Sequence, residues 1–168
     1  TLWKGVVGEN NYNEIIPERS LQQYILELYK KGVILAVNSR NNYDDSLFVI
    51  DKHPDMVLHK DNFSALKINW EDKAKNMLEL ARELNIGLDS FVFIDDDSFQ
   101  RENIKNSFPE IMVLSPEKLK NYAGFSSLTL TEEDKKRGHI YAEENKRKEL
   151  QSSLASVEYF LRQLNLKV

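Results

Sequence analysis

Three short apolar runs, separated by segments with helical periodicity, constrain the fold of this chain more than any other feature. The runs are residues 33–37, 91–94 and 111–114. An unbroken apolar run of this length is typical of a strand covered on both faces, and strands that alternate with helices pair in parallel through right-handed crossovers. The pattern therefore predicts an α/β fold in which the three runs are neighbours in one doubly wound parallel sheet.

The segments between the runs carry helix signals of differing strength. Ser20 and Gln23 form the pattern of a capping box and Gly32 supplies a stop, so a helix is expected between them. The strongest pattern covers residues 71–84, with Asn69 available as its cap. The inner face of that helix is expected at Ala74, Met77, Leu78, Ala81 and Leu84. Weaker signals predict helices over residues 45–50 and 98–106, a helix that opens at Ser115, and a short strand over residues 56–58.

The two ends of the chain differ in character from its centre. Residues 3–17 are rich in Gly, Asn and β-branched side chains, which favours a short extended flap or hairpin. Residues 131–151 are dense in charge and predict one helix, and residues 157–164 carry a second apolar stripe. We therefore expect an α/β domain over residues 1–125 and a helical C-terminal extension over residues 126–168, which packs against the α/β body or leads into another domain.

Composition excludes several classes of protein. The 168 residues are enough for one domain, and 23 Lys+Arg against 27 Asp+Glu give a net charge of −4, so nothing attracts nucleic acid or anionic lipid in general. No apolar run has the length of a membrane-spanning helix. The absence of Cys rules out disulfides and thiolate chemistry, and the three His residues lack the spacing of a zinc site. These features predict a soluble, cytoplasmic protein with no nucleic-acid or membrane partner.

Polar residues follow the first two apolar runs directly. The first run is followed by Asn38, Ser39 and Arg40, and the second by Asp95, Asp96 and Asp97. In open parallel sheets ligands bind beyond the carboxyl ends of the strands, so both clusters stand where a ligand is expected. The first cluster can hold an anionic oxygen, whereas the adjacent carboxylates of the second require a cation or hydrogen-bond donors.

Lys73 adds a positive charge to this edge. It lies in the first turn of the helix over residues 71–84, where a cation opposes the helix dipole and is a poor choice for stability alone. A hydroxyl, a lysine and paired carboxylates together indicate a phosphate site with Mg²⁺, which prefers oxygen ligands. Taken singly, a Ser at position 39 is more often a turn residue, and a Lys at position 73 is usually a solvated surface group. Trp3 and Trp70 flank the region, either as packing residues or as a substrate wall.

Several stretches of the sequence resemble the FkbH-like branch of the haloacid dehalogenase (HAD) superfamily over nearly the whole chain. They are residues 1–9, 37–41, 68–73, 91–96, 84–90 and 130–134. The resemblance implies a HAD-like fold and assigns roles to four residues. Ser39 would contact phosphate, Lys73 would neutralise its charge, and Asp96 would hold Mg²⁺ with support from Asp95.

The chain also departs from the pattern of that branch. The resemblance places the nucleophilic aspartate, a second acid and the strand that carries them in residues that precede Thr1. Members of the branch carry an acyl group on a Cys just before the phosphate-binding Ser, and here that position is Asn38. An amide cannot form a transferable thioester. Asp97 stands where an Asn is usual, which is a mild change.

Three functions remain open from the sequence. The first is an enzyme domain that dephosphorylates a phosphorylated three-carbon acid of the glyceryl or lactyl type and loads it onto an acyl carrier protein for polyketide biosynthesis. The second is a plain HAD phosphatase for a small phosphorylated metabolite, which the absence of Cys favours. The third is a non-catalytic module that binds a carrier protein. Substrate contacts are expected at Ser39, Arg40 and Lys73.

Overall fold

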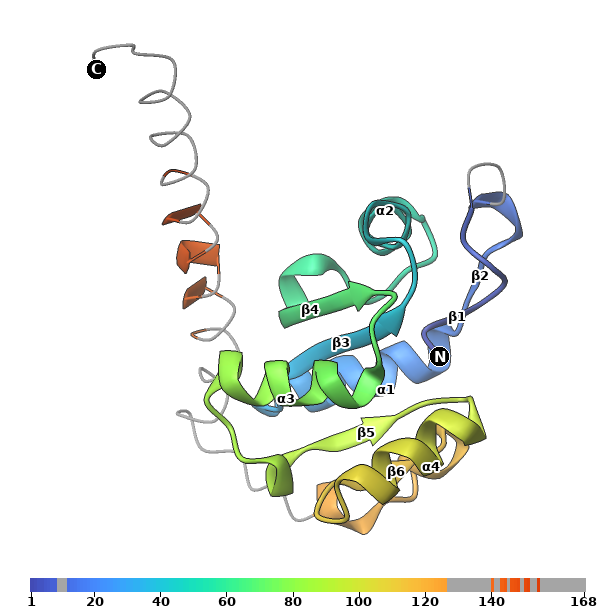
Figure 1. The fold of residues 1–168 in the computed structure, drawn as a ribbon. Helices are drawn as coiled ribbons and strands as arrows, with labels where there is room; N and C mark the ends of the chain where they lie inside the picture. The colour runs from blue at the N-terminus through green and yellow to red at the C-terminus, as the bar shows by residue number, and fades with distance from the viewer. Residues whose placement is uncertain are drawn as a thin grey trace, which may run out of the picture.

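A computed structural model describes residues 1–8 and 12–126, together with residues 140, 143–144, 146–148, 150–151 and 154 (Figure 1). Two parallel strand pairs form the centre of the molecule. Strand β3 (Leu35–Arg40) pairs with β4 (Phe63–Asn69), and β5 (Val92–Ile94) pairs with β6 (Met112–Leu114). The α/β class and the parallel pairing expected from the sequence are therefore confirmed.

The two parallel pairs do not join into the single sheet expected from the sequence. Strands β3 and β5 are not hydrogen-bonded to each other, and the described strands form three separate two-stranded sheets. The arrows of β3 and β5 point in the same direction, and the two strands are separated by a space (Figure 1). Each of these strands is therefore paired along one edge only.

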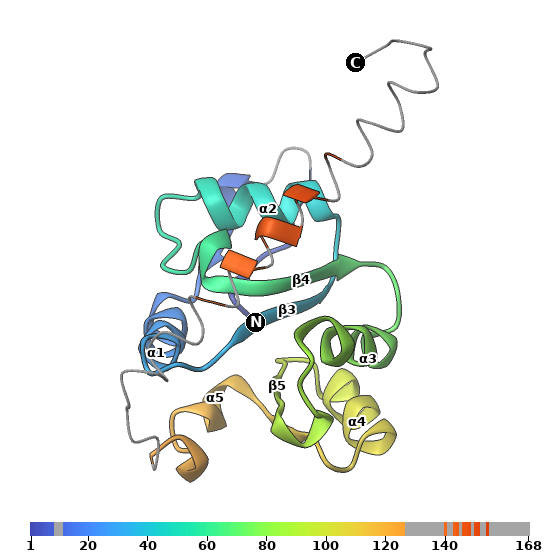
Figure 2. The same cartoon turned by 90° about the vertical axis from the view of Figure 1, so that its left-hand side faces the viewer.

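Helices cover both faces of this arrangement. Helix α1 (Arg19–Lys30) and helix α3 (Lys73–Leu84) lie on opposite sides of the interval between β3 and β5 (Figures 1 and 2). One core cluster joins α3 to residues of both strand pairs, and another joins α1 to both pairs on the opposite face. The two half-sheets are thus held in place by helices and not by backbone pairing.

The remaining helices are α2 (Tyr43–Lys52), α4 (Ser98–Ser107) and α5 (Pro116–Leu119), with 3-10 turns at Tyr12–Glu14, Lys60–Asn62, Leu88–Ser90 and Ala123–Phe125.

Two expectations about strands are wrong. The first strand begins later than residue 33 and continues through Arg40, because Asn38, Ser39 and Arg40 stay in register with residues 67–69 of β4. The short strand expected over residues 56–58 is a loop. The buried Gln22 side chain accepts hydrogen bonds from the backbone N–H groups of Val57 and Leu58 and so replaces a strand partner there.

Helix starts also differ from the sequence patterns. Glu18 occupies the N-cap of α1, and Ser20 lies inside the helix, where its hydroxyl accepts a hydrogen bond from Lys120. Asp72 caps α3, because its carboxylate accepts hydrogen bonds from the N–H groups of residues 74 and 75. Asn69, the expected cap, does not cap this helix. Gly32 stops α1 as expected, with a φ of 89° that favours glycine. In α3 the buried residues are Asn76, Met77, Leu80 and Leu84, and Leu78 is exposed.

The ends of the chain agree with expectation where the structure describes them. Strand β1 (Trp3–Lys4) pairs antiparallel with β2 (Ile16–Pro17), which forms the expected flap. The described residues between 140 and 154 are helical, and Lys146 makes an ion pair of 2.7 Å with Asp61. The apolar stripe over residues 157–164, His139 and the charged residues 131–137 lie outside the described part of the chain. Among the described residues, no helix combines the length and apolar character needed to cross a membrane.

Candidate active site

A cavity of about 1050 Å³ lies between β3 and β5. At the carboxyl ends of the strands its wall is polar, and Asn38, Ser39, Lys73, Asp95 and Asp96 all contribute to it. The structure therefore brings together the side chains that the sequence places at strand ends. Two residues are not part of this wall. Arg40 is exposed, and Asp97 caps α4 by accepting a hydrogen bond from the N–H of Phe99.

Lys73 and Asp95 form a buried ion pair at the polar end of the cavity. The Nζ atom of Lys73 lies 2.5 Å from Oδ2 of Asp95, and the two side chains are 12% and 6% exposed. The other carboxylate oxygen of Asp95 accepts a hydrogen bond from the N–H of Asp97. The cation at the N-terminus of α3, unfavourable to the helix itself, is therefore compensated by a carboxylate from the next strand.

Asp96 interacts with the first residue of the chain. Its Oδ1 atom lies 2.8 Å from the amino group of Thr1 and accepts a hydrogen bond from the Thr1 hydroxyl. The Asp96 side chain is 66% exposed, so it is reachable from solvent.

The loop that carries the two carboxylates is fixed by Arg101. One guanidinium nitrogen donates to the backbone carbonyls of both Asp95 and Asp96, at 2.8 Å each. Arg101 lies on α4, one turn after its start. The acidic loop is thus tied at both its backbone and its side chains.

Three asparagine side chains form a network behind Lys73. Asn38 donates to the backbone carbonyl of Lys73 at 2.9 Å and accepts from Asn76 at 3.1 Å. Asn76, which is fully buried, also exchanges hydrogen bonds with Asn69. The network links the ends of β3 and β4 to the first turn of α3. The Asn38 carboxamide is therefore engaged on both its oxygen and its nitrogen.

The carboxylates fit a magnesium ion better than a metal with nitrogen ligands. In the part of the chain that the structure describes, no group of three or more His, Asp or Glu residues is close enough together to hold a metal. Asp95 and Asp96 offer oxygen ligands, and Mg²⁺ commonly takes one or two carboxylates and completes its shell with water and phosphate. The rings of His53 and His59 contact backbone groups elsewhere, at Asp55 N and Ile50 O.

Two aromatic side chains are exposed in segments that follow strands. Trp70 comes directly after β4 and is 68% exposed, and Phe99 lies in the first turn of α4 and is 71% exposed. Trp3, by contrast, packs against the core cluster of Val49, Ile50 and Ile68. Of the two tryptophans, Trp3 therefore has a packing role and Trp70 does not.

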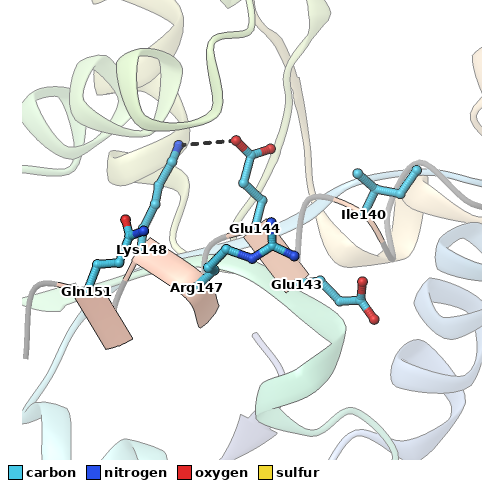
Figure 3. Close-up of a pocket in the computed structure, with 6 residues that line it drawn as sticks. All are labelled: Ile140, Glu143, Glu144, Arg147, Lys148 and Gln151. Carbon is cyan, nitrogen blue, oxygen red and sulfur yellow. Dashed lines mark ion pairs between the residues drawn. The ribbon is translucent and has the colours of Figure 1, made fainter. Parts of the chain in front are cut away.

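A second, smaller cavity of about 280 Å³ lies along the C-terminal helical residues (Figure 3). Its lining comes from one segment, residues 140–151, and is mostly charged, with Lys148 and Glu144 3.9 Å apart. The side chains of Lys148 and Glu144 are both exposed. This cavity lies apart from the strand ends that carry the polar cluster.

Sequence reasoning missed Asn76 and Arg101. Asn76 has a detectable signal, because it stands four residues before Leu80 and eight before Leu84, on the buried stripe of an otherwise apolar helix face. Arg101 has no such signal. Its role depends on which carbonyls the fold brings within reach.

Comparison with known proteins gives one informative match. No protein-family model matches the chain, and no curated protein matches it. Among solved structures, the chain is similar to the N-terminal part of the protein BF1531 from Bacteroides fragilis, which contains a phosphatase domain complexed with Mg. The identity is 32% and the TM-score is 0.68 over 78% of this chain. The chain spans 38% of the length of that protein chain, and the likeness confirms the HAD-like α/β fold expected from the sequence.

Proposed function

We propose that this chain supplies the phosphate-binding and metal-binding part of a Mg²⁺-dependent phosphatase that acts on a small phosphorylated molecule. The observation that carries the proposal is the meeting of Ser39, Lys73, Asp95 and Asp96 on one cavity wall at the carboxyl ends of parallel strands. The similarity to a phosphatase domain complexed with Mg supports it.

Each residue has a role that follows from its chemistry. The Ser39 hydroxyl donates to a phosphoryl oxygen, and the Lys73 ammonium offsets negative charge while Asp95 fixes its position. Asp96, with Asp95 beside it, would hold the metal. A bound Mg²⁺ would supply further stabilisation of charge on the phosphoryl group. The resemblance assigns attack on phosphorus to an aspartate that precedes Thr1, with the substrate alkoxide as leaving group and water cleaving the acyl phosphate.

Replacing Asp96 by Asn tests the metal assignment. In the full-length protein, we expect the variant to bind Mg²⁺ about tenfold more weakly or worse, because a neutral amide replaces an anionic ligand. Isothermal titration with Mg²⁺ and hydrolysis of p-nitrophenyl phosphate measure the effect. Asp97→Asn is the matched control, since Asp97 caps α4 and does not line the cavity. Equal Mg²⁺ affinity in the two variants would reject the role of Asp96.

The finer proposal concerns the substrate. The FkbH-like resemblance favours a phosphorylated three-carbon acid of the glyceryl or lactyl type and transfer of its acyl group to an acyl carrier protein. The engagement of the Asn38 carboxamide by Lys73 and Asn76 favours the plain phosphatase instead, because it gives position 38 a structural role.

Asn38→Cys separates these two functions. If the chain descends from an acyl-loading enzyme, the full-length variant given a phosphorylated glyceryl or lactyl donor gains an acyl adduct, because a thiolate then stands beside Ser39. Intact-protein mass spectrometry detects the adduct as added mass that hydroxylamine removes. Asn38→Ala is the control, since it disturbs the same network without a thiol. Phosphate release without an adduct would leave the plain phosphatase as the function.

A further inference from the structure

Asp95 and Asp96 both line one cavity, although they are adjacent in the chain. Successive side chains of a β-strand point to opposite faces, so a continuation of β5 through these residues would separate the two carboxylates. Strand β5 instead ends at Ile94, and the chain bends at Asp96. The shape of this bend therefore decides whether the two acids can act together.

Arg101 holds the bend through its side chain. Its Nη1 atom donates to the carbonyl oxygens of Asp95 and Asp96 at 2.8 Å each. Both bonds have a charged donor, and such hydrogen bonds are stronger than those between neutral groups. One nitrogen atom can reach both carbonyl groups only where the backbone brings them to the same side, so the two bonds specify the bend.

The helix that carries this guanidinium group is itself fixed. Helix α4 packs against β5 and β6 (Figure 1). Ile104, three residues after Arg101, is completely buried in the core cluster that also contains Met77 and Leu80 of α3. Arg101 thus connects an anchored helix to the acidic loop.

The two acids depend on Arg101 to different degrees. Asp95 has further partners, because Lys73 and the N–H of Asp97 contact its two carboxylate oxygens. The backbone of Asp96 is held through the Arg101 bond to its carbonyl, and its side chain is 66% exposed. Loss of the guanidinium group is therefore expected to displace Asp96 more than Asp95.

We propose that Arg101 is a positioning residue for the metal site. It holds Asp95 and Asp96 in the bend that places both on the cavity wall, and it thereby sets the affinity for Mg²⁺. Replacing a group that orients metal ligands typically changes the metal affinity by about 10–100-fold. The effect on affinity rests on the proposed function, whereas the control of the loop rests on the two hydrogen bonds alone.

Arg101→Ala in the full-length protein tests this role, and Lys105→Ala is the matched control. Lys105 lies one turn further along α4, carries the same charge and is exposed. By isothermal titration, we expect Arg101→Ala to bind Mg²⁺ about tenfold more weakly or worse, and Lys105→Ala to bind it as the parent does. Guanidinium chloride far below its denaturing concentration should restore part of the affinity of Arg101→Ala, and sodium chloride should not.

Hydrogen exchange without metal measures the loop directly. The N–H groups of Asp97 and Phe99 donate to the carboxylates of Asp95 and Asp97. We expect both amides to exchange about threefold faster or more in Arg101→Ala, while the amides that bond β3 to β4 keep their rates and report on global folding. Arg101→Lys keeps a cationic donor on α4, so it should show the same changes to a smaller extent, and it serves as the test variant if Arg101→Ala does not fold.

Equal Mg²⁺ affinity in the Arg101 variants and Lys105→Ala would overturn the proposal. Unchanged exchange of the two loop amides would also overturn it, because any loss of affinity would then arise elsewhere. A parent protein that binds no Mg²⁺ would contradict the proposed function instead. In that case faster loop exchange would still support the control of the loop by Arg101, and unchanged exchange would reject it.

Discussion

Lys73→Met is expected to abolish phosphatase activity and to lower the free energy of unfolding by about 3–5 kcal/mol. The Asp95 side chain is 6% exposed and has Lys73 as its ion-pair partner. Methionine keeps most of the side-chain volume and removes the charge, so a buried carboxylate is left without compensation. The same charge is the one proposed to face the phosphoryl group, which is why stability and activity fall together.

Urea denaturation and phosphate-release assays on the full-length protein measure this result. Lys75→Met is the matched control on the same helix, because Lys75 pairs with Glu71 at 2.9 Å while both side chains are 57% exposed. Such exposed pairs contribute little to stability, because solvent screens both charges. A second variant, Asp95→Asn with Lys73→Met, should recover part of the lost stability because it removes the unpaired charge. Equal destabilisation by the two lysine substitutions would contradict the assigned burial of the Lys73–Asp95 pair.

Asn76→Leu is expected to destabilise the protein by about 2–3 kcal/mol, although it replaces a fully buried side chain by an apolar one of similar size. The substitution leaves the Asn38 carbonyl oxygen and the Asn69 carboxamide without the partners that Asn76 supplies. Since Asn38 also holds the backbone carbonyl of Lys73, we expect kcat to fall as the first turn of α3 shifts.

Equilibrium unfolding together with steady-state kinetics tests this prediction. The control is Asn106→Leu, because Asn106 is exposed on α4 and away from the network. The Asn76→Asp variant should retain more activity than the Asn76→Leu variant, since its carboxylate still offers acceptor oxygens to the Asn69 side chain. An Asn76→Leu variant as stable as the Asn106→Leu variant would show that the network contributes nothing to folding.

The elements that sequence patterns located are those with a simple local period. Strands β5 and β6 and helices α3 and α4 lie close to their expected positions, because unbroken apolar runs and 3.6-residue stripes depend only on neighbouring residues. Strand β4 was missed because Ser64 and Lys67 interrupt its apolar character. Ser64 is buried by the fold, and Lys67 is satisfied by Glu79 and Glu83 of α3, residues that no local pattern connects to it.

The polar wall of the site was predictable in part for a general reason. Parallel strands bring their carboxyl ends to one edge, so Ser39, Asp95 and Asp96 follow from strand assignment, and Lys73 follows from its place in the first turn of α3. The sequence did not predict the partners of these residues. The Lys73–Asp95 pair, the Arg101 contacts and the orientation of Asn38 each join residues from different elements, and their geometry is set by packing.

By itself, the sequence determined the alternation of helices and strands, the parallel direction of the strands and the edge at which polar residues gather, since all three depend on local periodicity and chain connection. Only the tertiary structure decided that the parallel strands form two separate pairs, that a cavity lies between them and that Asn38 turns toward α3. The physical reason is that strand pairing and buried hydrogen bonds are contacts between distant residues, and their free energy depends on which groups the whole fold brings within reach.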